Sequence, residues 1–322
     1  MKIQEKFKNQ FYQKIFFLFF ILFLGILALL FENKYYYSGK GELIFFDVGE
    51  GDSIFIKTPQ NFTILIDGGP SKKIIYDFSE VLPFWNRKID LVVLTHPHSD
   101  HLLGLNEVLK YYKVGEFWFT GVLTDDPNYH QLINLIKEKN IPTKIIKMGD
   151  FKKFKDGSYL EILWPQDSIY QRKVNDLNFY SVVCRFRFGK NQFLFLADIN
   201  DKVEKEILKK FNLDVQLFKV LHHGADDSIL EDFVAKIHPD YALISVGKNN
   251  KFGHPSSKTL SLLEKYNVKI LRTDQLGKIV FIFNNQGIEK EFNKSTFLTN
   301  IFLFIKIIKE WKKLIYLTLL AT

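Results

Sequence analysis

The segment THPHSDHLLGL at residues 95–105 carries the side chains with the clearest capacity for chemistry. It holds three of the chain's eight histidines within six positions, His96, His98 and His101, and Asp100 lies among them. Imidazole and carboxylate groups together are suitable ligands for zinc, manganese or iron. Four such side chains in six residues exceed what one tetrahedral ion needs from a single segment. The spacing therefore predicts two adjacent divalent metal ions, zinc or manganese.

Three further segments carry ligand-type side chains after an apolar run or a glycine-containing turn. Asp198 ends the run QFLFLAD, His222 and His223 occur in VLHHGADDS, and His254 occurs in NNKFGHPS. Loops at the ends of strands commonly carry binding and catalytic residues. Asp198 has a second interpretation, because a carboxylate at this point can also cap a helix over residues 200–209.

The elements that must position these residues can be predicted from the spacing of apolar side chains. Short strands over LIFFDV, SIFIKT and FTILID are followed by alternating strand and helix patterns. IDLVVLT, just before the histidines, is typical of a buried strand, and the residues after Ser99 are typical of a helix start. Early hairpins followed by this alternation predict one α/β domain over residues 41–290, with two sheets and helices outside them.

The N-terminal end differs from the middle in hydropathy and charge. Residues 15–31 contain no charge, follow a basic segment at residues 1–14 and precede three tyrosines at 35–37. This pattern predicts a single transmembrane anchor over residues 15–33 in the plasma membrane, with a cytoplasmic N-terminus and an extracytoplasmic domain. A cleaved signal peptide is the alternative interpretation, although no small-residue cleavage site follows the apolar run.

The C-terminal segment, residues 297–322, has apolar residues at helical spacing and four interrupting lysines. It predicts a basic amphipathic helix that either lies on a membrane surface or packs on the domain. The formal net charge is +8, of which residues 1–14 and 301–322 contribute +3 each, so the rest of the chain carries +2. Composition alone therefore does not predict a nucleic-acid-binding body. The single cysteine, Cys184, excludes an intramolecular disulfide and a Cys-rich zinc site.

The motifs of the middle region resemble those of a known enzyme family. In the order seen in metallo-β-lactamase-fold hydrolases, the chain contains FFDVGEGDSIFI, ILIDGG, LTHPHSDHLLGL, FLFLADI, FKVLHHGADDS, NKFGHPS and LRTDQLGKI. The specific similarity is to the extracytoplasmic hydrolase domain of the ComEC-type DNA-uptake competence proteins, over about residues 41–285. The resemblance implies the metallo-β-lactamase αββα sandwich, in which two central mixed sheets are flanked by helices.

The resemblance also implies a ligand set for two metal ions. It assigns His96, His98 and Asp198 to the first ion. It assigns Asp100, His101, Asp198 and one histidine of the HHG pair to the second ion. His222 is the favoured ligand of that pair because it is nearer the strand end. His223 would then contact the ligands and not the ion. The reverse assignment stays open.

Several neighbouring residues have roles by the same resemblance. Many family members carry another histidine between the first motif and the bridging aspartate, where this chain has Asn178 and Ser181. We therefore expect weak binding of the first ion. Asp67 is expected to orient a ligand histidine from behind, whereas Asp47 and Asp52 either contribute to the site or cap turns.

The implied chemistry is hydrolysis by an activated water. Asp100 would orient the water, and His254 or His223 would assist the leaving oxygen. The chain shows no Gly-rich phosphate loop and no serine elbow, which argues against a nucleoside triphosphatase or a serine hydrolase.

Three functions are consistent with these features. The first is a membrane-anchored phosphodiesterase or nuclease that acts on extracytoplasmic, single-stranded DNA. A complete ComEC protein has many spanning helices and this chain shows one apolar run, so a separate channel protein is a candidate partner. The second is a metallohydrolase of another ester, such as a phosphorylcholine-type diester or a lactone. The third is a non-catalytic binding module on the same fold.

Overall fold

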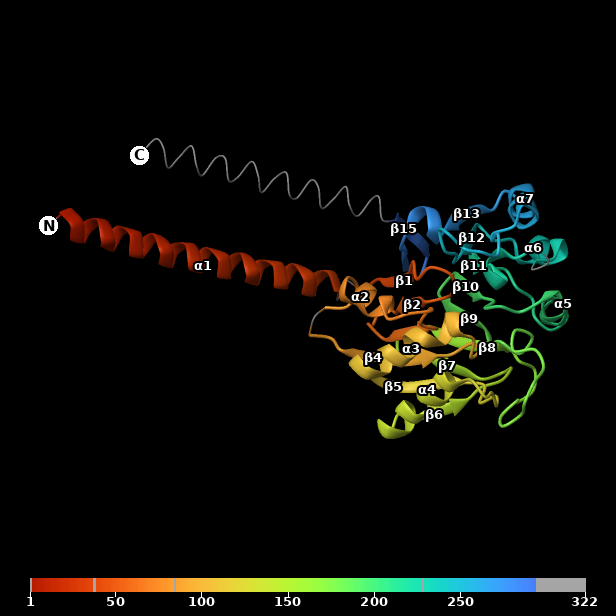
Figure 1. The fold of residues 1–322 in the computed structure, drawn as a ribbon. Helices are drawn as coiled ribbons and strands as arrows, with labels where there is room; N and C mark the ends of the chain where they lie inside the picture. Colours follow the sequence, from red (N-terminus) through yellow and green to blue (C-terminus); the bar gives the residue numbers. More distant parts are fainter. Residues whose placement is uncertain (1, 37–38, 84, 227–228, 294–322) are drawn as a thin grey trace.

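The computed structural model describes residues 2–36, 39–83, 85–226 and 229–293, and the C-terminal helix predicted at 297–322 lies outside them. Within the described residues, two β-sheets pack against each other and helices cover their outer faces (Figure 1). Both sheets contain parallel and antiparallel pairs. The predicted α/β arrangement of two mixed sheets with helices outside is confirmed.

The first sheet has the strand order β15-β14-β1-β2-β3-β4-β5-β6 and the second has the order β13-β12-β11-β10-β9-β8-β7. The strands of the first sheet are β1 (Gly41–Phe45), β2 (Ile54–Lys57), β3 (Thr63–Ile66), β4 (Lys88–Val93), β5 (Lys113–Phe119), β6 (Thr143–Ile145), β14 (Ile279–Asn284) and β15 (Gly287–Asn293). Those of the second are β7 (Phe151–Lys153), β8 (Tyr159–Trp164), β9 (Val183–Phe188), β10 (Asn191–Phe195), β11 (Leu217–Lys219), β12 (Tyr241–Ile244) and β13 (Lys269–Arg272).

The helices connect these strands and complete the outer layers. They are α1 (Lys2–Tyr36), α2 (Lys73–Ser79), α3 (Ser99–Tyr111), α4 (Pro127–Glu138), α5 (Asp201–Lys210), α6 (Glu231–Ile237), α7 (Ser257–Lys265) and α8 (Thr273–Leu276), with a short 3₁₀ turn, η1, over Leu221–Gly224.

Three apolar clusters hold the layers together. Successive side chains of a strand face opposite sides of a sheet, so in β1 Leu43 and Phe45 face the second sheet while Ile44 faces the helices. Phe45 meets Phe195 of β10 across the inter-sheet core, with 6.3 Å between ring centroids. Because both faces of the central strands are buried, these strands appear in the sequence as nearly continuous apolar runs.

Helix α3 is docked closely on the loop that follows β3. Gly68 N–H donates to the carbonyl of His101 at 2.8 Å, and Gly104 N–H donates to the carbonyl of Gly69 at 2.9 Å. A Cβ atom on Gly104 would lie 1.8 Å from the oxygen of Gly68, so only glycine allows this approach. The contact fixes the first turn of α3 against the loop that carries Asp67.

Helix α1 is continuous and extends away from the two sheets (Figure 1). Large apolar side chains along it, from Phe16 to Leu30, are exposed. In the part of the chain that the structure describes, no helix has the length and apolarity that crossing a membrane requires. The anchor predicted over residues 15–33 is therefore not confirmed.

Candidate metal centre

The candidate side chains lie at the carboxyl ends of strands from both sheets. Asp67 follows β3, residues 96–101 follow β4, Asp198 follows β10 and the HHG pair follows β11. Parallel pairing of β3 with β4, and of β10 with β11, places these ends side by side. Ligand sites of α/β sheets typically form at the carboxyl ends of parallel strands. The fold thus brings His101 into contact with Asp198, 97 residues further along the chain.

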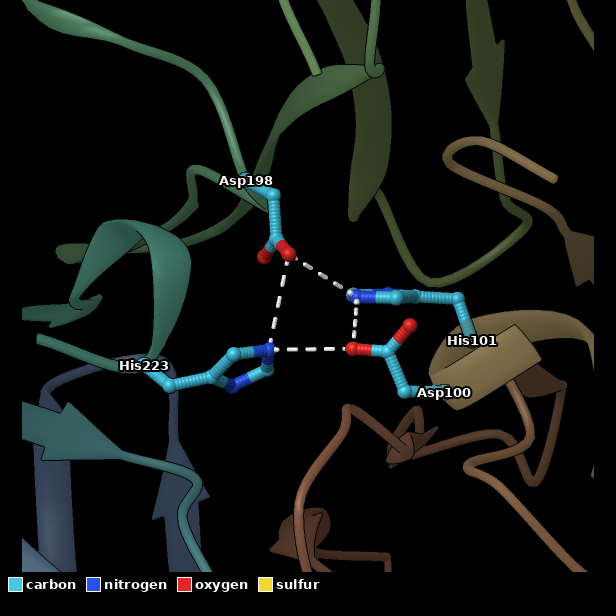
Figure 2. A group of neighbouring side chains, drawn as sticks. All are labelled: Asp100, His101, Asp198 and His223. Atoms are coloured by element: carbon cyan, nitrogen blue, oxygen red, sulfur yellow. Dashed lines mark hydrogen bonds and ion pairs between the residues drawn. The ribbon is translucent and has the colours of Figure 1, made fainter. Parts of the chain in front are cut away.

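Four side chains converge at this point, as Figure 2 shows. His101 Nε2 lies 3.2 Å from Asp198 Oδ2 and 3.5 Å from Asp100 Oδ2. His223 Nε2 lies 3.4 Å from each of the same two oxygens. One ligand atom from each residue therefore falls within 4.8 Å of the other three.

The donor set fits a divalent transition-metal ion. Two imidazole nitrogens and two carboxylate oxygens are the ligand types that zinc and manganese take from proteins. His223 Nε2 is buried, and among the described residues no group forms a hydrogen bond with it. A buried nitrogen that faces two carboxylate oxygens without a hydrogen bond is suited to a metal ligand.

The structure places His223 in this group and not His222, which the sequence analysis favoured as the ligand of the pair. His223 Nδ1–H donates to the carbonyl of Ser245 at 2.8 Å. That bond fixes the tautomer and leaves Nε2 to face Asp100 and Asp198. His222 is half-buried, and its ring centroid lies 5.9 Å from that of His254.

Positive φ angles at non-glycine residues occur at four positions of the site. They are 58° at Asp67, 49° at Ala197, 45° at His222 and 53° at His223. Such a conformation is uncommon for residues with a side chain and persists where surrounding contacts impose it. At η1 the two consecutive left-handed residues turn the chain so that His223, and not its neighbour, faces Asp198.

His96 and His98, predicted as ligands of the first ion, lie beside this group. His96 Nε2 is 3.0 Å from His98 Nδ1 and 4.0 Å from Asp198 Oδ2. The Thr95 hydroxyl donates to Asp67, so it accepts from His96 Nδ1–H, which leaves Nε2 of the neutral ring unprotonated. Burial and the neighbouring His101 hold the pKa of His96 well below its usual value. A neutral imidazole is the form that binds a metal, although neither described group of potential metal ligands includes these two histidines.

Asp67 supports the site from behind, as the sequence predicts by resemblance. Its carboxylate accepts from Thr95 N–H at 2.8 Å, from the Thr95 hydroxyl at 2.7 Å and from His101 Nδ1–H at 2.8 Å. Burial raises the pKa of Asp67, and these donors oppose the increase. The bond to His101 orients the Nε2 atom of that ring toward Asp198.

The carboxylates of the site stabilise positive charge on the groups beside them. Burial opposes charge on His101, but Asp198 and Asp67 outweigh it and hold the pKa of His101 well above its usual value. Despite burial, Asp198 similarly raises the pKa of His223 to about 10. Burial would also raise the pKa of Asp100, but His223 and His101 hold it well below its usual value. Metal binding would displace the protons from both imidazoles and supply the positive charge in their place.

Lys219 and Asp52 form a buried ion pair that the sequence analysis did not assign. Lys219 Nζ lies 2.5 Å from Asp52 Oδ2 and 3.4 Å from Asp198 Oδ1, and it donates to the carbonyl of Ala197 at 2.9 Å. Asp52, Asp67 and His101 are also close enough together to hold an ion. In this second group Lys219 already supplies the positive charge, so we interpret it as an internal charge network. The sequence contains one indication of this pair, because Lys219 lies within the apolar strand FKV. A fully buried lysine is rare unless it is paired.

Asp47 and Asn178 lie outside the two groups. Asp47 accepts from Lys73 through its main-chain carbonyl. Val182 N–H donates to the carbonyl of Thr95 at 3.0 Å and places the Asn178 segment beside the THPHSDH motif. Asn178 Oδ1 is buried and has no hydrogen-bond partner within the described part of the chain.

His254 faces the centre from the loop between β12 and α7. Its Nδ1–H donates to Glu50 Oε1 at 3.2 Å, and Glu50 Oε2 accepts from Gly247 N–H at 3.0 Å. The ring centroid of His254 lies 6.4 Å from that of His223, with 25° between the planes. Glu50, which sequence reasoning missed, thus fixes His254, whose ring lies beside those of His222 and His223.

Comparisons with known proteins agree with this geometry. The family model of the metallo-beta-lactamase superfamily matches residues 46–248. The chain is 30% identical over 267 residues to ComE operon protein 3 of Bacillus subtilis (strain 168), covering 77% of this chain and 34% of that protein. It is 27% identical over 251 residues to competence protein ComA of Neisseria gonorrhoeae, covering 76% of this chain and 33% of that protein. The chain thus spans about a third of the length of these relatives.

A solved structure supports the fold. The metallo-beta-lactamase fold protein YhfI from Bacillus subtilis superimposes with a TM-score of 0.52 at 9% identity, over 76% of this chain and 100% of YhfI. The resemblance predicted from the sequence, to metallo-β-lactamase-fold hydrolases and within them to competence proteins, is confirmed.

Proposed function

We propose a phosphodiesterase function for this chain, which belongs to the metallo-beta-lactamase superfamily because that family's model matches residues 46–248. The proposed reaction is metal-dependent hydrolysis of a phosphodiester in extracytoplasmic DNA. The observation that carries it is the convergence of Asp100, His101, Asp198 and His223 around one point, with Asp198 placed between both imidazoles. The Asp198 carboxylate is close enough to His96 to serve a second ion as well.

The proposed ligands divide into two sets that share Asp198. The first set is His96, His98 and Asp198, and the second is Asp100, His101, Asp198 and His223. When bound, zinc or manganese at such a centre lowers the pKa of water to about 7 and stabilises negative charge on a phosphoryl oxygen. The missing family histidine before Asp198 makes the first ion the weaker one.

The chain's own residues supply orientation and proton transfer. Asp100 is half-buried, unlike the buried His101 and Asp198, so its carboxylate can accept a hydrogen bond from the attacking water. Glu50 accepts from His254 Nδ1–H, which leaves Nε2 to exchange a proton with the leaving oxygen.

DNA is the proposed substrate because the relatives are named as competence proteins. A separate channel protein is part of the proposal as a candidate partner in the transport of DNA. No observed feature favours a phosphorylcholine-type diester, a lactone or a purely binding role over DNA.

Membrane attachment is part of the proposal. Its support is the uncharged run at residues 15–31, preceded by basic residues, and the exposed apolar side chains of α1. The domain would then lie outside the plasma membrane with residues 1–14 in the cytoplasm. Protease digestion of intact cells tests this orientation, which requires cleavage of the domain and protection of the N-terminus.

The test of the catalytic proposal combines metal analysis with a substrate panel. The purified chain is assayed with single-stranded DNA, a small chromogenic phosphodiester, glycerophosphocholine and a lactone. Asp198→Asn should lose bound metal and activity, whereas Asp201→Asn, which changes a partly exposed aspartate on α5 that pairs with Lys205, should retain both. Equal activity of wild type and Asp198→Asn would overturn the metal assignment. If the chain hydrolyses only glycerophosphocholine or only the lactone, that compound and not DNA is the substrate.

A further inference from the structure

We infer that the loop at residues 247–258 is a contact surface for a single-stranded nucleic acid, with Phe252 as the platform on which a nucleobase stacks. The segment connects β12 to α7, includes the first two residues of α7 and carries His254. The inference rests on the proposed function, since it concerns the strand that would enter the metal centre.

The charge of the loop favours a polyanion. Its sequence, GKNNKFGHPSSK, contains Lys248, Lys251 and Lys258 and no acidic residue. All three lysines are exposed. Because residues 15–300 as a whole carry only +2, a segment of twelve residues with +3 is a local concentration of positive charge.

An aromatic stack connects this basic loop to the metal centre. Phe252 is 72% exposed, and its ring centroid lies 5.6 Å from that of His254 with 22° between the planes. His254 in turn stacks on His223 with 25° between the planes. The three rings therefore run nearly parallel from solvent to a residue that contacts Asp100 and Asp198.

Hydrogen bonds hold Phe252 in this position before any ligand binds. Asn250 Oδ1 accepts from His254 N–H at 2.9 Å, and Asn250 Nδ2 donates to the carbonyls of His254 and Gly247 at 2.8 and 3.1 Å. The asparagine closes the loop around Phe252 and fixes the two aromatic residues relative to each other. A preorganised platform loses less conformational freedom when a ligand stacks on it.

These features together select a single strand over a duplex. An exposed phenylalanine alone would be unremarkable, but this one stacks on a site histidine within a basic, acid-free loop. Proteins that bind single strands combine positive charge along the backbone path with aromatic side chains that stack on unpaired bases. The bases of a duplex already stack on one another, so their faces are not available to Phe252.

The first test compares two substrates in the full chain. We measure kcat/KM for a single-stranded oligothymidylate and for a small chromogenic phosphodiester, and take their ratio. Phe252→Ala should lower this ratio about tenfold, mainly through KM for the oligonucleotide, and Phe252→Trp should restore it. Phe151→Ala removes an exposed phenylalanine on β7 and should not change the ratio. An unchanged ratio for Phe252→Ala would overturn the inference.

The second test measures binding and does not need catalysis. Fluorescence anisotropy gives the affinity for labelled oligothymidylate at several salt concentrations. Lys248→Gln combined with Lys251→Gln should weaken binding and reduce the slope of log K against log salt by about 1.4, the value for two lost phosphate contacts to a single strand. If wild type hydrolyses neither substrate, the proposed function fails, and equal affinities of wild type and Phe252→Ala would then reject the platform separately.

Discussion

Lys219 Nζ lies 2.5 Å from Asp52 Oδ2, and both side chains are almost completely buried. The same ammonium group faces Asp198 Oδ1 at 3.4 Å, while the other oxygen of Asp198 faces His101 and His223. One carboxylate oxygen of Asp198 is therefore directed to Lys219 and one to the candidate metal ligands. Lys219, at the end of β11 and held by Asp52 from the loop before β2, thus sets the orientation of Asp198.

Removal of Lys219 should destabilise the fold in a way that zinc partly reverses. Lys219→Met leaves the Asp52 and Asp198 carboxylates without their shared cation, which should cost about 3–5 kcal/mol in the free energy of unfolding. A divalent cation at the centre compensates Asp198, one of these two carboxylates. The increase in melting temperature on addition of zinc should therefore be larger for Lys219→Met than for wild type.

A second buried ion pair provides the matched control. Lys57 pairs with Glu42 across β1 and β2. Lys57→Met should also lower the free energy of unfolding, but zinc should raise its melting temperature no more than it does for wild type. Equal effects of zinc on both lysine variants would show that Lys219 does not act on the centre.

Asp67 should control metal affinity without touching the metal. Asp67 uses both carboxylate oxygens to accept from Thr95 N–H, the Thr95 hydroxyl and His101 Nδ1–H. An asparagine side chain has only one accepting oxygen and cannot accept all three hydrogen bonds. Asp67→Asn should therefore weaken metal binding about 10–100-fold, measured by competition with a chromogenic chelator. Asp90 accepts from the main-chain N–H and hydroxyl of Thr63 in the same way. Asp90→Asn is thus the control, and a comparable loss of affinity there would contradict the role of Asp67.

The two histidines of η1 should differ in effect. His223→Ala removes a nitrogen that lies 3.4 Å from both Asp100 and Asp198, so it should lose metal and at least about 100-fold in kcat/KM. His222→Ala removes a half-buried ring outside the group and should retain the metal. Metal analysis and phosphodiester hydrolysis on both variants separate the two assignments. A variant of His222 that loses metal while His223→Ala keeps it would reverse them.

The layered fold could be predicted because its strands have simple patterns. The runs around Leu43, Ile64 and Leu91 are apolar on both faces, and glycine, proline and aspartate separate them. Their alternation with helices indicates two covered sheets. The order of strands could not be obtained in this way, since the pairing of β1 with β14 joins segments that are distant in sequence.

The site could be predicted by residue type but not by orientation. Motif spacing was enough to nominate Asp100, His101 and Asp198. The choice between His222 and His223 depends on two left-handed backbone conformations, which residue spacing does not reveal. Lys219 was missed because its partners, Asp52 and Asp198, lie in loops distant from it in sequence, and only the fold shows that its charge is compensated.

A buried carboxyl group on α5 should make stability depend on pH. Glu204 Oε2 accepts from Leu230 N–H at 3.0 Å, whereas Oε1 is buried and has no hydrogen-bond partner in the described residues. Burial raises the pKa of Glu204 well above its ordinary value of 4.5. The folded state therefore keeps a proton that the unfolded state releases. The contribution of this group is complete below about pH 4.5 and is lost as the pH rises through the folded-state pKa.

Glu204→Gln removes this titration and should stabilise the protein at neutral pH. At about pH 7 the free energy of unfolding of the variant should exceed that of wild type, because wild type must bury a charge or retain a proton against the solution pH. The difference should shrink toward about pH 4, where the group is protonated in both states of wild type. Urea unfolding across this range gives the difference directly. Glu206→Gln changes a partly exposed glutamate of the same helix that pairs with Lys209, and it should show little of this dependence. A difference between Glu204→Gln and wild type that stays constant with pH would mean that Glu204 is already ionised in the folded protein.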